Sequence, residues 1–244
     1  MKEMSAARPA FYALRAGSWR DVVTLLHPPY TLLHLSFVAL GAALAPVVRW
    51  DRLAATLAAF FLAVGIAAHF LDELHGRPLG TRLSRRALGV GATVALTAAC
   101  LVGALGLLVV SPLLLVFVAA GAFVVLAYNL ELAHGAFHGD RVFALFWGAF
   151  PFLTAYWVMD ESLGWSALPG AVACYAVAYL QRALSTPARN LRRRVASVQG
   201  NMVRHDGVDE PITRETLLAA PERALRALCV AVPLFALAVL LARG

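Results

Sequence analysis

The sequence AHFLDELHGRP, residues 68–78, ends a long apolar run and places several ionisable residues together there. Ionisable groups at the end of a membrane-spanning run are costly, so they commonly mark an ion or substrate site. A second sequence, NLELAHGAFHGD at residues 129–140, repeats the pattern at the end of another apolar run. The two stretches hold four of the seven histidines. We therefore interpret them as two halves of one functional site.

The composition indicates a membrane protein. The chain of 244 residues is 61% hydrophobic and 14% charged, and its mean hydropathy is +0.73, whereas about a quarter of the residues of a soluble domain are charged. Each of the three cysteines lies alone in an apolar run, which predicts neither a disulfide framework nor a thiolate metal site. The predicted fold is an all-α, polytopic bundle of membrane helices.

The apolar runs divide the chain into two parts. Residues 1–29 mix aromatic and aliphatic residues with arginines and end in His27-Pro28-Pro29, which predicts a helix lying on the cytoplasmic membrane surface. Residues 30–244 form the bundle. Because a span needs about 20 residues, we expect seven spans. They are 30–48, 53–71, two between 87 and 130 that divide at Ser111-Pro112, 142–159, 167–184, and 222–242 with Pro221 in its first turn.

The basic residues predict the orientation of these spans. With the N-terminus in the cytoplasm, every basic residue except Arg49, Arg52 and Arg243 falls in the N-terminal arm or a cytoplasmic loop, in agreement with the positive-inside rule. The net charge of +7 is attributed to orientation and to anionic lipid headgroups, and no nucleic-acid partner is predicted. We expect an integral protein of a prokaryotic plasma membrane, with the N-terminus inside and the C-terminus outside.

The loop at residues 185–220 is the one sizeable soluble segment that we expect. Its Leu191, Val195 and Val198 share a helical face, which predicts an amphipathic helix at the membrane surface. The adjacent run Arg192-Arg193-Arg194 is interpreted as a contact with lipid headgroups, and phosphate binding is the alternative.

The polar residues of the two opening stretches have the types and spacing of metal ligands. Asp72 and His75 are three residues apart, as are Glu131 and His134, and this spacing offers a carboxylate and an imidazole to one metal. The expected topology brings both stretches to the cytoplasmic ends of their spans. Mixed ligation of this kind suits iron, zinc or manganese. The predicted metal ligands are His69, Asp72, Glu73, Glu131, His134 and His138.

A second reading of the same residues involves carboxylates alone, which would hold magnesium against a diphosphate. Arg77 would then stabilise the phosphate charge. The predicted catalytic residues are Asp72, Glu73, Arg77 and Glu131. Other polar side chains are expected at the same depth and are predicted to bind the substrate. They are His34, Tyr128, Asn129, Tyr179 and Arg182.

The run from Asp72 to Leu79 resembles the first signature of the UbiA-type intramembrane prenyltransferases, an Asp-rich motif that ends in Arg-Pro after the second helix. The stretch from Tyr128 to Asp140 takes a place comparable to that of the family's second Asp-rich motif. Histidines stand here where that family has aspartates, and seven spans are expected rather than nine. The resemblance implies transfer of a prenyl group from a magnesium-bound diphosphate.

Three functions follow as hypotheses. The first is a metal-dependent membrane enzyme that carries out UbiA-like prenyl transfer on an isoprenoid or lipid substrate at the cytoplasmic face. The second is a di-iron lipid oxidase, hydroxylase or desaturase. The third is a divalent-metal transporter or sensor, for which the centres of the spans offer few carboxylates.

Overall fold

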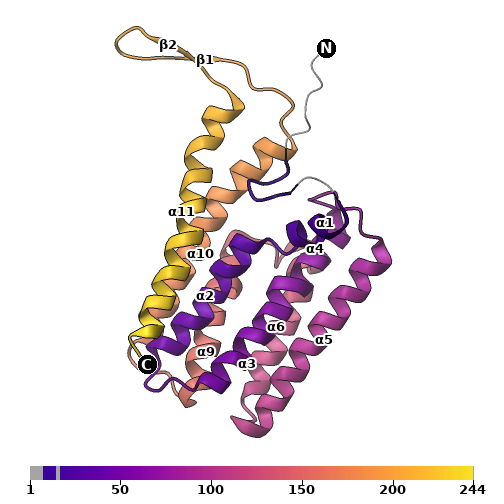
Figure 1. The fold of residues 1–244 in the computed structure, drawn as a ribbon, viewed down its shortest axis with the longest axis vertical. Helices are drawn as coiled ribbons and strands as arrows, with labels where there is room; N and C mark the ends of the chain where they lie inside the picture. Colours follow the sequence, from indigo (N-terminus) through magenta and orange to yellow (C-terminus); the bar gives the residue numbers. More distant parts are fainter. Residues whose placement is uncertain (1–7, 15–16, 244) are drawn as a thin grey trace.

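A computed structural model of the chain describes residues 8–14 and 17–243. Most of this described chain is helical, with very little sheet, which confirms the predicted all-α class (Figure 1). Two short strands, β1 (Asn201–Val203) and β2 (Asp209–Pro211), pair antiparallel in a hairpin. The helices in chain order are α1 (Ser18–Leu25), α2 (Pro28–Leu44), α3 (Trp50–Phe60), η1 (Phe61–Ala68), α4 (His69–Gly76), α5 (Arg85–Val109), α6 (Leu114–Asn129), α7 (Leu132–Gly135), α8 (Asp140–Ala144), η2 (Leu145–Ala149), α9 (Phe150–Asp160), α10 (Ala167–Arg193) and α11 (Arg214–Leu241).

Two of the long rods contain a π-helical stretch, in which backbone hydrogen bonds run from residue i to residue i+5. η1 joins α3 to α4 without a break, and η2 joins α8 to α9 in the same way. π-Helical turns are rare and are often found at functional sites.

A helix covers each of the seven segments predicted to span the membrane. Within the described residues, four helices are long and apolar enough to cross it: Trp50–Gly76, Arg85–Val109, Asp140–Asp160 and Arg214–Leu241. α1 and α2, bent by 43°, add a fifth if they are counted as one span, and α6 is apolar but shorter. The protein therefore carries membrane-spanning helices, and the number seven stays a prediction.

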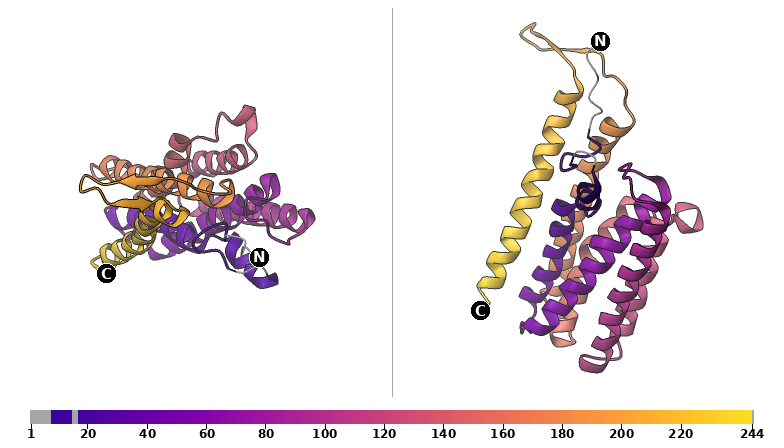
Figure 2. Two further views of the ribbon diagram at one scale, coloured as in Figure 1. Left: turned by 90° about the horizontal axis from the view of Figure 1, so that it is seen from above. Right: turned by 45° about the vertical axis from the view of Figure 1, so that its right-hand side comes forward.

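Successive rods run in opposite directions, so the bundle has two distinct ends. α1 and the hairpin of β1 and β2 lie at one end, and the end of α11 lies at the other (Figures 1 and 2). We call the first end the arginine-rich end, because the N-terminal arm and the loops at this end carry most of the basic residues. α2, α5, α8 and α11 begin there, and α4, α6 and α10 end there.

The three arginines of the opposite end have a structural explanation. Arg52 donates to the carbonyl oxygen of Val158 at 2.8 Å, and Arg49 binds the same last turn of α9. Arg243 donates to the carbonyl oxygen of Ala45, just after α2, at 2.9 Å. The last carbonyls of a helix lack intrahelical donors and carry partial negative charge. These arginines therefore cap helix ends.

The bundle has two apolar cores. The first lies between α2, α9, α10 and α11 and includes Phe37, Phe152 and Tyr156. α2 and α9 approach so closely there that a Cβ on Gly41 would lie 2.2 Å from the carbonyl oxygen of Phe152. Small residues at such a contact let two membrane helices pack tightly. The second core lies between η1, α5, α6 and η2.

The helix that contains the sixth predicted span is longer than the span itself. α10 continues to Arg193 instead of ending near residue 184, and the separate amphipathic helix expected across residues 191–198 does not form. Arg192, which we had assigned to lipid headgroups, makes a two-pronged ion pair with Glu222 of α11, with 2.8 Å between Nη2 and Oε2. Hydrogen bonding to this carboxylate raises the pKa of Arg192. The pair holds the extended part of α10 against α11.

The last helix also begins earlier than expected. α11 starts at Arg214, and Pro221 lies inside it rather than in its first turn. Thr213 caps this start, because its side chain accepts from the amide of Thr216 at 3.1 Å while the Thr216 hydroxyl accepts from the amide of Thr213 at 2.9 Å. This reciprocal capping box fixes the helix start eight residues upstream of the proposed one.

The N-terminal arm is only partly helical. α1 is its helix, and residues 8–14 lie against the arginine-rich ends of α2 and α10. Arg193 donates to the carbonyl oxygen of Pro9 at 3.1 Å, and the amide of Leu14 donates to the hydroxyl of Thr24 at 3.0 Å. Residues 1–7 and 15–16 of the predicted surface arm lie outside the described residues.

Candidate functional site

Each π-helical stretch has a backbone carbonyl that binds a histidine. His69 Nδ1 lies 3.0 Å from the Gly65 oxygen in η1, and His34 Nδ1 lies 2.9 Å from the Trp147 oxygen in η2. A π-helical turn disturbs the regular backbone ladder, so a buried carbonyl there needs another donor. A carbonyl only accepts, so Nδ1 carries the proton in both histidines and Nε2 is left as an acceptor.

His69 stacks on His27, with 4.2 Å between the ring centroids. His27 joins α1 to α2 and has a φ of 46°, a left-handed conformation that residues other than glycine adopt only uncommonly. Strain of this kind gathers at functional sites. Tyr12 of the N-terminal segment also contacts His27, with ring centroids 5.3 Å apart. Burial raises the pKa of Tyr12.

Tyr128, at the end of α6, lies near the same place. His138 stacks on it at 4.4 Å between ring centroids and donates from Nδ1 to its carbonyl oxygen at 3.0 Å. The Tyr128 side chain is buried, and its hydroxyl has no hydrogen-bond partner among the described residues. Such a group costs about 1–3 kcal/mol. A ligand or water that bonds to this hydroxyl would recover that free energy.

Arginines of α10 surround this group. Arg182, Arg189 and Arg193 are seven and four residues apart, which places them on one helix face. Burial, together with the positive charges of Arg182 and Arg193, lowers the pKa of Arg189, while Tyr128 and Asp72 are close enough to act in the opposite sense. Arg189 therefore lies near both Asp72 and Tyr128. We call the following residues the polar cluster: Tyr12, His27, His69, Asp72, Tyr128 and Arg189.

The remaining residues predicted to bind substrate have mixed positions. His34 is buried, with 5.5 Å between the centroids of its ring and that of Phe143. Arg182 pairs with Asp140 at 2.9 Å. Asn129 is buried but donates to the Val125 oxygen of its own helix at 2.7 Å.

Tyr179 and His75 lie away from the polar cluster. Tyr179 is 44% exposed and stacks on Tyr175 along α10, with 6.3 Å between ring centroids. His75, which lies three residues after Asp72 in the sequence, is exposed at the end of α4.

Two of the predicted catalytic residues shape the loop between α4 and α5. The Glu73 side chain is 0% exposed and accepts from the amides of Leu79 at 2.9 Å and Thr81 at 2.7 Å. Arg77 donates to the carbonyl oxygens of Thr81 and Leu83 at 2.9 and 2.8 Å. Both side chains are therefore occupied by their own loop.

The second stretch does not continue as a helix. α6 ends at Asn129, and Glu131, Ala133 and His134 all have positive φ angles, which a helix excludes. Glu131 and His134 are exposed on this loop, and only His138 turns back, onto Tyr128. The three-residue spacing of Glu131 and His134 therefore does not fall on a regular α-helix.

The six predicted metal ligands are not brought together. Within the described part of the chain, no group of three or more histidine, cysteine or carboxylate side chains has an arrangement suited to a metal ion. Asp72 is the one carboxylate of the polar cluster, and Glu73 is engaged by its loop. These donors do not fit a metal held by the protein alone. They fit magnesium that arrives with a phosphate ligand, because such magnesium needs only one or two protein carboxylates.

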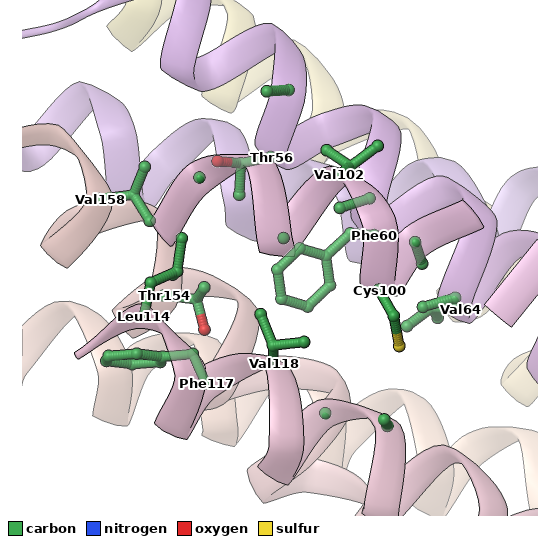
Figure 3. Close-up of a pocket in the computed structure, with 18 of the residues that line it drawn as sticks. Thr56, Phe60, Val64, Cys100, Val102, Leu114, Phe117, Val118, Thr154 and Val158 are labelled. Atoms are coloured by element: carbon green, nitrogen blue, oxygen red, sulfur yellow. The ribbon is translucent and has the colours of Figure 1, made fainter. Parts of the chain in front are cut away.

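An apolar cavity of about 280 Å³ lies between α3, α5, α6 and α9 (Figure 3). Phe60, Cys100, Phe117 and Val118 are among the side chains that face it. Its volume is close to the lower limit of about 300 Å³ for small-molecule sites. Some of its wall, such as Leu105 at 64% exposed, is also part of the outer surface, so the cavity opens on the side of the bundle.

Trp147 links the cavity to the polar cluster. Its side chain lines the inner end of the cavity, and its ring centroid lies 4.6 Å from that of Tyr128. From Arg52 to Val64 the cavity follows α3 and η1 over a length on the order of 15–20 Å at the rise of a helix. The site is thus amphipathic, with a long apolar part that ends at a polar, arginine-bearing part.

Sequence reasoning missed three members of the polar cluster. Tyr12 and His27 were assigned to a surface arm, and Arg189 was counted only among the basic residues of a loop. One signal was available for His27, since a histidine before Pro28-Pro29 marks a sharp change of chain direction. Tyr12 and Arg189 join the site through tertiary contacts that no local pattern encodes.

Comparisons with protein families, characterised proteins and solved structures found no match to this chain. The site is therefore interpreted from its own geometry.

Proposed function

We propose that this protein is an integral membrane enzyme that acts on an isoprenoid or lipid substrate, and that its reaction is a UbiA-like prenyl transfer. One observation carries the proposal. Trp147 lines the apolar cavity, and its ring contacts that of Tyr128 in the polar cluster, with 4.6 Å between the ring centroids. A substrate with an apolar chain and a polar head has the same division, and the chain would lie in the cavity with its head at the polar cluster.

In this reaction the bond between the first prenyl carbon and a diphosphate oxygen breaks, and its electron pair leaves with the diphosphate. A nucleophilic atom of the acceptor bonds to that carbon and releases a proton. His69 can take this proton, because its Nδ1 is bound to the Gly65 oxygen and its Nε2 remains an acceptor. Asp72 would hold magnesium carried by the diphosphate. That metal would supply neutralisation of the leaving-group charge.

The di-iron alternative is less well supported. A di-iron bundle presents carboxylates and histidines inward from its helices, whereas Glu73 is bound by its loop and Glu131 is exposed. A transporter would need polar groups along its path, and the cavity wall is almost entirely apolar.

The test uses a matched pair of substitutions in α3. Ala59 lines the cavity, whereas Ala58 is exposed and does not. Ala59→Leu should weaken binding of geranylgeranyl diphosphate, because the added atoms fill the cavity, and should leave binding of inorganic pyrophosphate unchanged. Calorimetric titration of the purified protein in lipid nanodiscs measures both affinities.

Ala58→Leu is the control and should change neither affinity. Equal affinities of Ala59→Leu, Ala58→Leu and wild type for geranylgeranyl diphosphate would overturn the proposed use of the cavity. Release of pyrophosphate from geranylgeranyl diphosphate should in addition be lost in Asp72→Asn.

A further inference from the structure

We propose that Arg189 and Arg193 of α10, with the hydroxyls of Tyr128 and Tyr12, form a binding site for a phosphate group. The N-terminal segment, residues 8–14, would form one wall of this site. The assignment rests on the proposed function for the class of ligand, a phosphate or diphosphate at the head of an apolar chain. It gives the arginines of α10 the role that the sequence suggested for Arg77.

The first argument is the balance of charge. Arg182, Arg189 and Arg193 share one face of α10, and the nearby carboxylates are Asp140, which pairs with Arg182, and Asp72. One positive charge is left over. In the described part of the chain Arg189 takes part in no ion pair, and its recorded hydrogen bond goes to Thr186 on its own helix at 3.3 Å. An anion would balance this partly buried charge.

The second argument comes from hydrogen bonding. Tyr128 is 5% exposed, and its hydroxyl has no partner among the described residues, although Arg189 is close enough to act on it. Gln181 of α10 is 3% exposed and has an unpartnered Oε1. Buried polar atoms without partners are uncommon in folded proteins. A bound phosphate would accept from the Tyr128 hydroxyl.

The third argument is the contact with the N-terminal segment. Arg193 donates from Nε to the carbonyl oxygen of Pro9 at 3.1 Å, so this neutral partner leaves the charge of Arg193 uncancelled. Tyr12 contacts His27 and Tyr30, with ring centroids 5.3 and 5.4 Å apart. Burial raises the pKa of the Tyr12 hydroxyl, and the positive charges of Arg189 and Arg193 oppose this rise, so both arginines lie near it. The segment thus brings a fourth donor to the arginines.

The chemistry favours phosphate over other anions. Guanidinium groups bind phosphate oxygens in a bidentate manner, and several donors can surround one tetrahedral group. The same phosphate chemistry could belong to a free phosphate or to a lipid headgroup, and the experiment separates the two sources.

The experiment measures binding of inorganic pyrophosphate to the full chain in phosphatidylcholine nanodiscs by calorimetry. Arg189→Gln should weaken this binding about tenfold or more, because a charged, two-pronged contact is lost, and Tyr128→Phe should weaken it less. The matched control is Arg223→Gln. Arg223 is exposed at the same end of the bundle and donates to Ala219 of its own helix, so its loss should leave the affinity unchanged.

A second arm replaces part of the phosphatidylcholine with phosphatidic acid. If the site takes a lipid headgroup, phosphatidic acid will compete with pyrophosphate in wild type and will not do so in Arg189→Gln. If pyrophosphate binds and phosphatidic acid does not compete with it, the site is assigned to the head of a diphosphate substrate. Absence of any phosphate binding, or equal weakening in Arg189→Gln and Arg223→Gln with both proteins folded, would overturn the proposal. Pyrophosphate has no apolar chain, so prenyl transfer can fail while this site stands.

Discussion

Asp72 and Glu73 are neighbours in the sequence and have different surroundings. Glu73 has no exposed surface, and its two oxygens accept from two amides and the Thr81 hydroxyl. Asp72 is partly exposed and makes no hydrogen bond to another described residue. Its negative charge lies near enough to Arg189 to oppose the lowering of the pKa of that arginine. A carboxylate whose acceptor sites are all used stabilises the fold, whereas one that faces a cation and open space is available to a ligand.

A pair of amide substitutions separates these two roles. Glu73→Gln places an amide group against backbone donors, so we expect a loss of about 1–3 kcal/mol of stability. At about 2–4 °C for each kcal/mol, thermal unfolding in detergent should begin several degrees lower. Asp72→Asn should unfold at the wild-type temperature and lose function. Unchanged unfolding of Glu73→Gln would contradict a structural role for this residue.

At the level of elements, apolar periodicity was sufficient to locate the helices. Each predicted span contains one, and the break at Ser111-Pro112 separates α5 from α6 as expected. The sequence did not show where helices stop at the arginine-rich end. α10 runs on because Arg192 pairs with Glu222, a residue far away in the chain. Contacts of this kind leave no local signal.

The candidate site was predicted in part for the same reason. The structure brings His69, Asp72 and Tyr128, which were singled out in the sequence, near one another, because topology alone brings the ends of α4 and α6 to one level. The roles of Glu131 and His134 depended on an extended helix, and that helix ends at Asn129. The π-helical stretches, whose carbonyls orient His34 and His69, were not visible in the sequence.

The contact between α2 and α9 gives a prediction at this scale. Gly41→Ala would place a Cβ 2.2 Å from a backbone oxygen of Phe152, so the helices must separate. We expect a loss of about 1–3 kcal/mol from overpacking, measured by thermal unfolding in detergent. Gly89→Ala in α5 is the control, because its nearest neighbour would be 4.0 Å away. It should be neutral or stabilising, since alanine is the better helix former.

On the scale of the whole molecule, the cavity lies where the two apolar cores meet: Leu114 and Val158 of the first core line it, as do Val64 and Val125 of the second. η1 and η2 both border this region, and both carry the carbonyl that fixes a histidine. The first core, built on the tight packing of α2 against α9, thus supplies part of the cavity wall.

The orientation of the bundle in the membrane decides from which side the polar cluster receives its ligand. Three arginines, Arg49, Arg52 and Arg243, do not follow the positive-inside rule. All three cap helix ends, so their position has a structural reason and does not argue against the predicted orientation. We therefore expect the arginine-rich end in the cytoplasm. Two exposed positions test this, Ser162 between α9 and α10 and His205 in the hairpin.

In intact cells, Ser162→Cys should react with a membrane-impermeant maleimide, and His205→Cys should react only after the membrane is opened. The unchanged chain is the background control, because Cys174 and Cys229 are buried and Cys100 faces the apolar cavity. Reaction of His205→Cys in intact cells, without reaction of Ser162→Cys, would place the arginine-rich end outside. The polar cluster would then draw its ligand from the external side, and a phosphate head supplied by cytoplasmic metabolism would no longer fit the site.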